Sequence, residues 1–257
     1  MKTKIVSSGY KGITSAEIYV AATKSHSADS LLLKRRNEIW RTEISGVDVV
    51  VKSFGSALMG QAVYAVRTSK ARRSFEFALE IRYRGFYSPA PIGYMERRAP
   101  GHILMSSVYI CEYISDMSLE DAFAAYGDEC IEAFAAFVVR LHKSGIRHDD
   151  LNSTNVRVRR SDDGEFRFSL IDLNRMRIYP EGVEVPMHEC FANVSRFTYD
   201  NKVMETFAHK YAALRGLPEG YGEVVMQAKL DFDHRLFRRK TVLHALGRAV
   251  GLRKGKN

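Results

Sequence analysis

The stretch from His148 to Arg175 constrains the fold of this chain more than any other part of its sequence. Hydrophobic and polar residues alternate on both sides of Asp163-Gly164, a dipeptide typical of the two-residue turn of a β-hairpin. A turn centred there places Asn155 directly opposite Asp172, where opposed side chains lie about 4.5–5.5 Å apart at Cβ. Because amide and carboxylate oxygens suit a hard cation, the pair predicts a Mg²⁺ site. A slip of one residue in the turn would keep both groups at the same end of the hairpin.

A second carboxylate precedes the hairpin. Asp150 lies within His148-Asp149-Asp150-Leu151-Asn152-Ser153-Thr154-Asn155, directly after a helical pattern that ends near Ser144-Gly145. We expect Asp150 to face the same cation and to accept the proton of a hydroxyl that attacks a phosphorus centre. We expect His148, in contrast, to be a packed and hydrogen-bonded scaffold residue.

Strand signals dominate the first hundred residues. Asp48–Phe54 (DVVVKSF) is a β-branched run bounded by glycines, and Leu31–Lys34 and Ile39–Ile44 are its expected partners in one antiparallel sheet. Met105–Ile114 predicts a further, buried strand. This part of the chain therefore predicts a β-rich smaller lobe, residues 1–114, which we expect to bind a nucleotide.

One helical pattern lies within that lobe, and others follow it. The spacing predicts a helix over about Ser69–Arg84, with Phe75, Leu79 and Arg82 along one face. From Ser118 onward the pattern is helical, and its clearest part is an apolar stripe formed by Cys130, Phe134, Phe137, Val138 and Leu141. We therefore expect a mainly helical catalytic and acceptor-binding lobe over residues 115–257.

Positive charge is concentrated at the end of the chain. The formal net charge is +9, and residues His234 to Asn257 hold eight Lys or Arg and no acid. Leu236, Leu243, Leu246 and Val250 can share one face of a helix there, flanked by basic residues. Such a helix predicts peripheral binding to an anionic membrane surface, and the alternative is a solvated helix packed on the larger lobe. We expect no nucleic-acid partner.

Export and membrane insertion are not expected from this sequence. The first residues lack the apolar core of a secretory signal, and no apolar stretch approaches the ~18 residues of a membrane span. The 3 cysteines share no C-x-x-C spacing, so a disulfide framework and a thiolate zinc site are not expected. We therefore expect a cytoplasmic protein whose cysteines fill the core.

These motifs resemble the protein-kinase-like superfamily, and within it the lipopolysaccharide kinase (Kdo/WaaP-like) family. The kinase loop H-R-D-L-x-x-x-N resembles His148–Asn155, and the D-F-G triplet resembles Asp172-Leu173-Asn174. The D-L-N-x-x-N form, followed by the run Ile171–Arg175, is more similar to bacterial sugar and lipopolysaccharide kinases than to protein kinases. The resemblance implies an α+β, bilobal protein-kinase-like fold that uses ATP and Mg²⁺.

The resemblance also implies roles for the residues already singled out. Asp150 corresponds to the catalytic base, and Asn155 and Asp172 correspond to the Mg²⁺ ligands. Val50-Val51-Lys52 resembles the strand whose lysine holds the α- and β-phosphates of ATP.

Two further parts of the nucleotide site follow from the same resemblance. Glu76 corresponds to the helix partner of the strand lysine, and Glu80, one turn later on the same face, is the rival candidate. The run from Cys111 resembles the hinge, in which Cys111 takes the gatekeeper place and the backbone of Glu112 and Ile114 would bind adenine.

Four departures from the protein-kinase pattern bear on function. No G-x-G-x-x-G precedes Lys52, where Gly46 is the single glycine of the turn, and no A-P-E segment follows the triplet. Asp149 replaces the arginine of H-R-D, and Asn174 replaces the glycine of D-F-G. They argue against protein-kinase regulation and keep open a pseudokinase or regulatory nucleotide-binding module.

The resemblance implies an acceptor in lipopolysaccharide biosynthesis. We expect transfer of phosphate from ATP to a Kdo or heptose sugar of the inner core, at the cytoplasmic face of the inner membrane. A protein kinase or another small-molecule kinase remains an alternative, because it would share the same core. Arg175, Arg177 and Arg196 are candidates for binding an anionic sugar, although scattered arginines more often form surface ion pairs.

Overall fold

The computed structural model describes residues 1–24, 27–34, 37–55, 68–198 and 200–249. The chain forms two compact units. Unit 1 consists of Met1–Met117 and Asn155–Met176, and unit 2 consists of Ser118–Thr154 and Arg177–Asn257. The assignment of nucleotide binding to residues 1–114 and of catalysis and acceptor binding to residues 115–257 stays a prediction.

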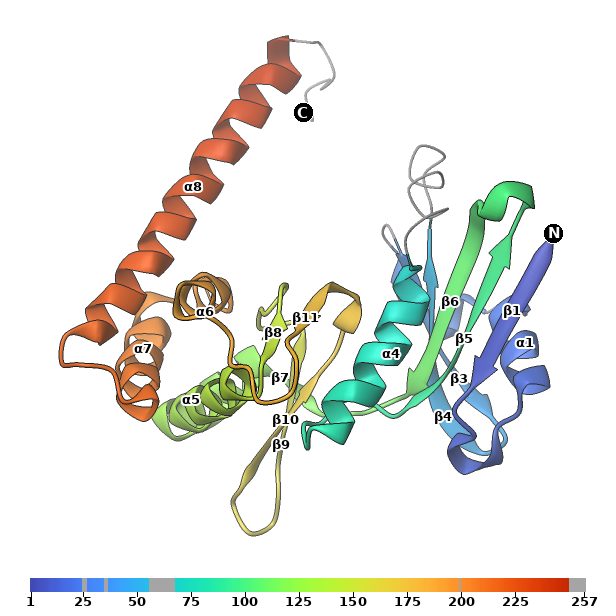
Figure 1. Ribbon diagram of the computed structural model, residues 1–257, viewed down its shortest axis with the longest axis horizontal. Coiled ribbons are helices and arrows are strands. Elements are labelled where there is room, and N and C mark those ends of the chain that lie inside the picture. Colours follow the sequence, from blue (N-terminus) through green and yellow to red (C-terminus); the bar gives the residue numbers. More distant parts are fainter. Residues whose placement is uncertain (25–26, 35–36, 56–67, 199, 250–257) are drawn as a thin grey trace. The chain divides into compact units, whose positions relative to one another are not determined.

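Unit 1 is built on a six-stranded antiparallel sheet with the order β1-β5-β6-β4-β3-β2 (Figure 1). Its strands are β1 (Lys2–Ser7), β2 (Leu31–Lys34), β3 (Asn37–Ile44), β4 (Val47–Phe54), β5 (Pro91–Arg98) and β6 (Leu104–Glu112). The predicted strands and the antiparallel pairing of the first three of them are confirmed. Ser45 and Gly46 join β3 to β4 with φ of 49° and 74°, as a primed two-residue turn requires.

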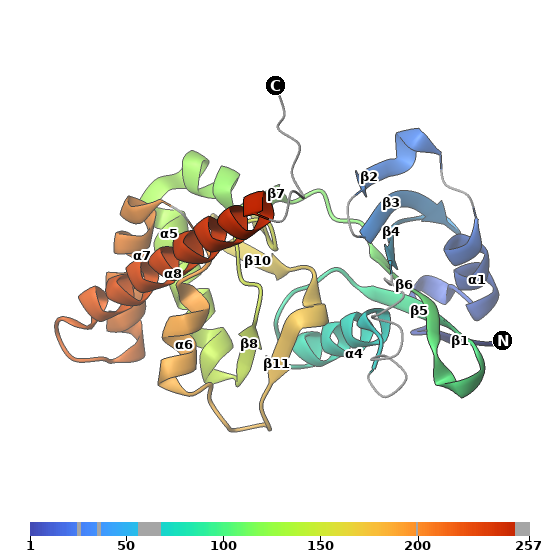
Figure 2. The ribbon, with the colours of Figure 1, turned by 90° about the horizontal axis from the view of Figure 1, so that it is seen from above.

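One helix covers each face of this sheet (Figure 2). Because side chains alternate along β4, Val49 and Val51 pack with Ile18 of α1 (Ser15–Thr23), while Phe54 packs with Phe75 of α4 (Lys70–Tyr83). The helix predicted over about 69–84 is confirmed. Its predicted apolar face is wrong in part, because Leu79 is 44% exposed. The buried positions of α4 are Ala71, Ser74, Phe75, Ala78 and Ile81.

A β-hairpin after the sheet confirms the predicted strands but not their register. β9 (Val156–Arg160) pairs with β10 (Phe166–Leu170), and Arg160 lies opposite Phe166. The N–H of Gly164 donates to Ser161 O, and the N–H of Ser161 donates to Glu165 O, so the loop has three residues rather than two. Gly164 has φ of 88°, which completes a type I turn followed by a bulge. Asn155 therefore lies opposite Ile171, one residue from the predicted register.

Short elements complete unit 1 and the connection to unit 2. The bounds of the remaining short helices and strands are η1 (Tyr10–Gly12), η2 (Ala28–Ser30), η3 (Pro100–His102), β7 (Met117–Ser118), η4 (Leu173–Arg175) and β11 (Met176–Ile178). Within unit 1, α4 contacts η4, and the N–H of Leu170 donates to Tyr87 O at 2.9 Å. These contacts hold η4 against α4 and the hairpin against the segment that follows α4.

Unit 2 is mainly helical. Its elements are α5 (Leu119–Lys143), β8 (Ile146–His148), α6 (Met187–Val194), α7 (Asn201–Arg215) and α8 (Tyr221–Ala249). Phe134 stacks on Phe137 and meets Phe197 and Phe207 at ring-centroid distances of 5.4 and 5.7 Å. The predicted apolar stripe of α5 is confirmed, because every one of its residues is buried.

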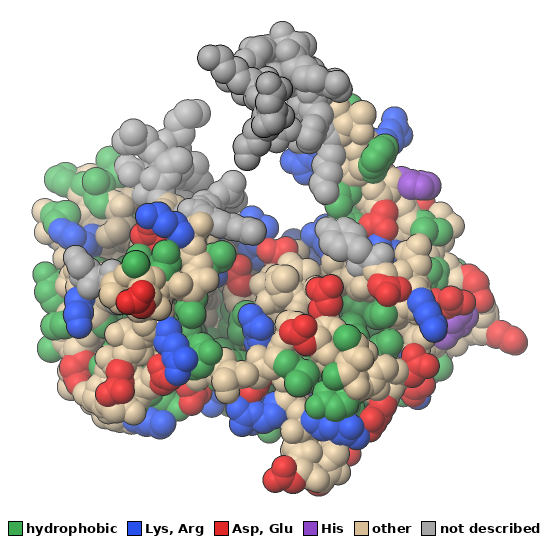
Figure 3. Space-filling view, turned by 180° about the vertical axis from the view of Figure 1, so that it is seen from behind, with side chains coloured by type: hydrophobic (Ala, Val, Ile, Leu, Met, Phe, Trp, Pro, Cys, Tyr) green, Lys and Arg blue, Asp and Glu red, His purple; other side chains and the backbone are tan. Residues whose placement is uncertain are grey.

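The C-terminal helix α8 includes most of the predicted basic tail. Lys or Arg, hydrophobic and His side chains lie next to one another along this helix (Figure 3). Leu236 is half-buried, and the neighbouring Phe237 is 72% exposed. Val250, and the side chains of Lys240, Leu243, Leu246 and Arg248, lie outside the described residues. Within the described part of the chain, the helices are too short or too polar to cross a membrane.

Candidate active site

Lys52 of β4 makes the contact that defines the site in unit 1. Neighbouring side chains of a strand point to opposite faces of the sheet, and Val51 faces α1, so Lys52 faces α4. Its Nζ lies 5.2 Å from the centre of the Phe54 ring. Nζ donates to Oδ1 of Asp172 at 2.5 Å, and the two side chains are 12% and 29% exposed. The predicted phosphate-binding lysine and the predicted metal ligand are thus brought together across 120 residues of chain.

The backbone of Asp172 departs from the strand that precedes it. Asp172 has φ of 57° and ψ of 47°, a left-handed conformation that a non-glycine residue adopts at some cost. Asn174, buried in η4, donates from Nδ2 to the same Oδ1 at 2.5 Å. Both donors therefore bind the same carboxylate oxygen of Asp172. The comparison with D-F-G assigns no role to Asn174. The D-x-N spacing of Asp172 and Asn174 is the sequence signal that points to this contact.

Asn155 lies at the same end of the hairpin as Asp172. Its side chain is buried, and its backbone carbonyl oxygen accepts from the N–H of Ile171 at 3.0 Å. The described residues contain no group of three or more His, Cys, Asp and Glu placed to hold a metal. An amide and a carboxylate oxygen fit Mg²⁺, which keeps several waters and needs few protein ligands. The roles of Asn155 and Asp172 as its ligands stay predictions.

The candidate glutamates of α4 have other partners. Oε1 of Glu76 accepts from Nε of Arg72 at 2.7 Å, and Oε1 of Glu80 accepts from Nε of Arg84 at 2.7 Å. Among the described residues, neither glutamate lies within ion-pair distance of Lys52. The proposed pairing of Lys52 with Glu76 or Glu80 stays a prediction, and in this structure Asp172 takes the place of that partner.

The predicted hinge lies at the end of β6. The N–H of Glu112 donates to Ala90 O at 2.9 Å, so of the two predicted adenine-binding positions only Ile114 can offer its N–H. The carboxylate of Glu112 accepts from the hydroxyl of Tyr10 at 3.0 Å. Burial raises the pKa of the Cys111 thiol to about 12. Cys111 is therefore a neutral side chain at the predicted gatekeeper position rather than a thiolate.

In unit 2, the loop after β8 fixes the position of Asp150. The N–H of Asp150 donates to Nδ1 of buried His148 at 3.2 Å, and the N–H of Leu151 donates to His148 O at 3.0 Å. His148 is thus the hydrogen-bonded scaffold residue that we expected. Nδ2 of Asn152 donates to the carbonyl oxygen of Asp150 at 3.1 Å and lies 3.4 Å from its Oδ1. Asn152 was part of the motif, but its orienting contact was not predicted.

Charged side chains surround this loop within unit 2. Nε of Arg147 donates to Oδ1 of Asp149 at 2.5 Å, and its Nη1 binds Glu189. The hydroxyl of Tyr179 donates to Glu189 at 2.7 Å, which is the main reason that the pKa of Glu189 is lowered. Asp149, at the position of the H-R-D arginine, thus binds an arginine that lies two residues earlier in the chain.

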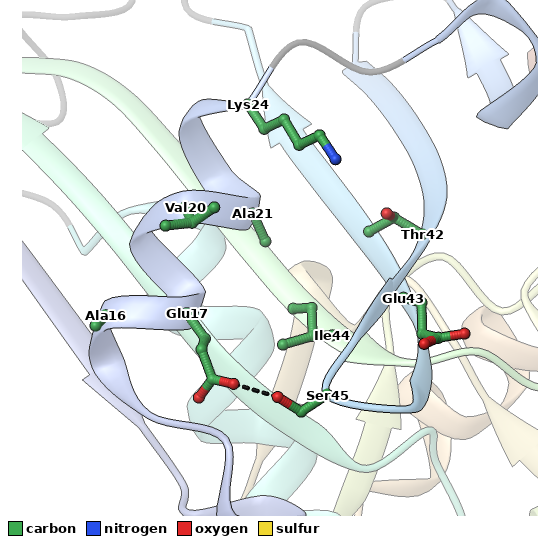
Figure 4. Close-up of a pocket in the computed structure, with 9 residues that line it drawn as sticks. All are labelled: Ala16, Glu17, Val20, Ala21, Lys24, Thr42, Glu43, Ile44 and Ser45. Atoms are coloured by element: carbon green, nitrogen blue, oxygen red, sulfur yellow. Dashed lines mark hydrogen bonds between the residues drawn. The ribbon is translucent and has the colours of Figure 1, made fainter.

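A cavity of about 300 Å³ lies on the other face of the sheet in unit 1 (Figure 4). It is lined on one side by α1 and on the other by β3 and the turn that follows it, and Glu17 and Ser45 are hydrogen-bonded at its edge. Because Lys52 faces α4 rather than α1, this cavity is not part of the candidate active site.

Comparisons with known proteins bear on the family and the fold. Residues 59–181 match the model of the lipopolysaccharide kinase (Kdo/WaaP) family. A solved structure of WaaP in complex with acyl carrier protein is similar, with a TM-score of 0.58, 18% identity, and coverage of 90% of this chain and 98% of that chain. The Rio2 kinase–ADP/Mg²⁺–phosphoaspartate complex from Chaetomium thermophilum has a TM-score of 0.47 and 15% identity, over 85% of this chain and 67% of that one. Among curated proteins, none matches this chain.

Proposed function

We propose that this chain is an ATP-dependent kinase that phosphorylates a Kdo or heptose sugar of the lipopolysaccharide inner core. Residues 59–181 match the lipopolysaccharide kinase (Kdo/WaaP) family model, and the fold is similar to that of WaaP. The observation that carries the proposal is the contact of Lys52 with Asp172, since it joins two residues that the family resemblance assigns to one nucleotide site. The transfer takes place at the cytoplasmic face of the inner membrane.

Each of the candidate site residues has a separate role in this phosphoryl transfer. Lys52 neutralises the α- and β-phosphates of ATP, and the hinge backbone at Glu112 and Ile114 binds adenine. Asn155 and Asp172 would hold Mg²⁺, which when bound would offset negative charge on the phosphates. Asp150 accepts the proton of the acceptor hydroxyl as its oxygen attacks the γ-phosphorus, and ADP leaves.

An arginine beside Asp150 supports an anionic acceptor. Nη1 of Arg196 donates to Asp149 O at 3.1 Å, and its guanidinium group lies 5.3 Å from the centre of the Phe232 ring. Among the described residues, no carboxylate pairs with Arg196, whereas Arg177 is paired with Glu189. Arg196 is therefore a cation held next to the catalytic loop with donors available for a sugar carboxylate or phosphate.

Phosphoryl transfer to a panel of acceptors tests this proposal. The protein is given ATP labelled at the γ-phosphate, Mg²⁺, and separately a core oligosaccharide, a generic protein substrate and an aminoglycoside. We expect label in the oligosaccharide alone. Label only in the protein or the aminoglycoside would assign the chain to one of the alternative kinases, and label in none would favour the regulatory nucleotide-binding module.

The basic part of α8 supports a place at the membrane. Arg235, Arg238 and Arg239 are exposed near Phe237, a combination of cations and an aromatic ring that suits an anionic lipid surface. Each basic residue near such a surface contributes roughly 1 kcal/mol. We expect the protein to sediment with anionic vesicles at low salt and to be released as salt rises. Binding equal to that of a chain ending at Phe232 would contradict this role.

A protein partner is part of the proposal as well. The similar solved structure is of WaaP in complex with acyl carrier protein, and we propose a partner of the same kind for this chain. Co-purification of acyl carrier protein with the full chain is the test.

A further inference from the structure

A buried chain of hydrogen bonds in unit 2 connects α7 to the loop that carries Asp150. Nδ2 of Asn193 on α6 donates to the backbone oxygen of His148 at 2.7 Å. Oδ1 of Asn193 lies 3.0 Å from Nε2 of His142 on α5, and Nδ1 of His142 lies 2.8 Å from the hydroxyl of Tyr211 on α7. Three helices and the catalytic loop are therefore joined by three consecutive contacts.

The direction of every bond in this chain follows from its first member. A backbone carbonyl oxygen only accepts, so Nδ2 of Asn193 faces His148 and Oδ1 faces His142. Because that Oδ1 also only accepts, Nε2 of His142 carries the proton. Nδ1 is then an acceptor, and the hydroxyl of Tyr211 donates to it. All the donors are thus oriented consistently, and the arrangement needs a neutral imidazole.

Burial makes this arrangement rigid. The side chains of His142, Asn193, Tyr211 and His148 are all buried. Loss of one partner would leave a buried polar group without a hydrogen bond, and this would destabilise the folded state because no water can replace the bond. Burial also lowers the pKa of His142 to about 4, which keeps the imidazole neutral at physiological pH.

The chain of bonds reaches Asp150 through His148. The carbonyl oxygen of His148 accepts from both Asn193 and the N–H of Leu151, and Nδ1 of His148 accepts from the N–H of Asp150. Asp150 and the residue after it, Leu151, are thus both hydrogen-bonded to His148, whose backbone oxygen also binds Asn193. We propose that Asn193, His142 and Tyr211 are positioning residues that hold Asp150 in its catalytic orientation. This inference rests on the proposed role of Asp150 as the base.

The consequence is a specific kinetic effect. A displacement of about 1 Å in a reacting group costs roughly 10²-fold in rate. The predicted ATP-binding residues Lys52 and Asp172 belong to unit 1, whereas the members of the chain of bonds belong to unit 2, so we expect the KM for ATP not to depend on these bonds. Breaking the chain of bonds should therefore lower kcat and leave the KM for ATP unchanged.

The variant Asn193→Asp breaks the chain at the contact nearest to the loop. Its carboxylate still accepts from His142, but it has no N–H for His148 O. We expect kcat to fall roughly 10- to 100-fold with the KM for ATP unchanged. Val194→Ala is the matched control, because Val194 is a buried aliphatic neighbour on the same helix. It lowers the Tm without removing a hydrogen bond, so its kcat should stay near that of the unmodified protein.

Two comparisons decide the outcome. A kcat for Asn193→Asp equal to that of Val194→Ala would overturn the proposal. If Asn193→Asp does not fold, Tyr211→Phe removes only the far hydroxyl, and an unchanged kcat for this variant would overturn the proposal instead. Asn193→Asp added to Asp150→Asn should cause no further loss, since both act on one step. Full turnover of Asp150→Asn alone would refute the proposed role of the base, which is a different result.

Discussion

Replacing Asn174 by Ala removes one of the two donors that hold the carboxylate of Asp172. In the folded protein, Oδ1 of Asp172 accepts from Nζ of Lys52 and from Nδ2 of Asn174, each at 2.5 Å. The variant keeps the ion pair with Lys52 and loses the contact that connects the carboxylate to η4. Asp172 is then free to leave its left-handed backbone conformation, which the surrounding contacts now maintain.

The size of the effect follows from the exposure of the bond. A hydrogen bond to a charged group contributes about 1.5–3 kcal/mol. Asp172 is 29% exposed, so water replaces part of the lost bond and the lower end of this range applies. About 1.4 kcal/mol corresponds to a tenfold change in an equilibrium constant. We therefore expect the Kd for ATP with Mg²⁺ to rise about tenfold in Asn174→Ala.

Isothermal titration calorimetry with ATP and Mg²⁺ measures this change. Gln227→Ala is the matched control, because Nε2 of Gln227 donates to Asp231 at 2.8 Å on the surface of α8. It removes the same kind of amide-to-carboxylate bond outside the candidate nucleotide site, and its Kd should equal that of the unmodified protein. An unchanged Kd in Asn174→Ala would refute the reasoning that Asn174 fixes the metal-binding carboxylate.

Three further predictions concern other charged groups. Lys52→Met should largely abolish the rise in Tm that ATP with Mg²⁺ causes, and an undiminished rise would contradict a phosphate-binding lysine. Arg196→Ala should raise the KM for an anionic sugar while the KM for ATP stays the same, and equal changes in both would contradict an acceptor role. The pKa of His142 is lowered to about 4. Between about pH 6.5 and pH 4, the imidazole is therefore protonated in the unfolded chain but not in the folded one. The free energy of unfolding should therefore be highest above about pH 6.5 and fall toward pH 4. In His142→Phe, Tm should fall less steeply between pH 6.5 and pH 4 than in the unmodified protein. An equally steep fall would contradict the attribution of this pH dependence to His142.

The strands of unit 1 could be predicted because their signals are local. Asp48–Phe54 is a β-branched run next to a glycine turn, and the sheet forms where the run predicts it. The N-terminal helix α1 was missed although Thr14 and Glu17 form a capping box, a pattern that a sequence can show. The hairpin register was wrong by one residue, because Asp163-Gly164 fits both a two-residue turn and the three-residue loop that forms.

Local sequence patterns do not predict contacts between residues that are far apart in the chain. The motifs predicted that Lys52 and Asp172 share a site, yet the direct bond between them depends on how the hairpin packs beside β4 and α4. Glu76 matched the motif position, but its sequence neighbour Arg72 is one helical turn away and binds it. Asn193 and His142 are polar residues within amphipathic helices, where spacing alone does not distinguish a buried network from a solvated face.

Turnover and ATP affinity of Asp150→Asn, measured beside those of Asp172→Asn, test the central claim most directly. Asp150→Asn keeps the size of the side chain but removes the proton acceptor, so kcat should fall by orders of magnitude while the Kd for ATP with Mg²⁺ stays unchanged. Asp172→Asn removes charge from the predicted metal site and should weaken both turnover and Mg²⁺-dependent ATP binding. Equal effects of the two variants on ATP affinity, or full turnover in Asp150→Asn, would contradict this division between a catalytic base and a metal-binding carboxylate.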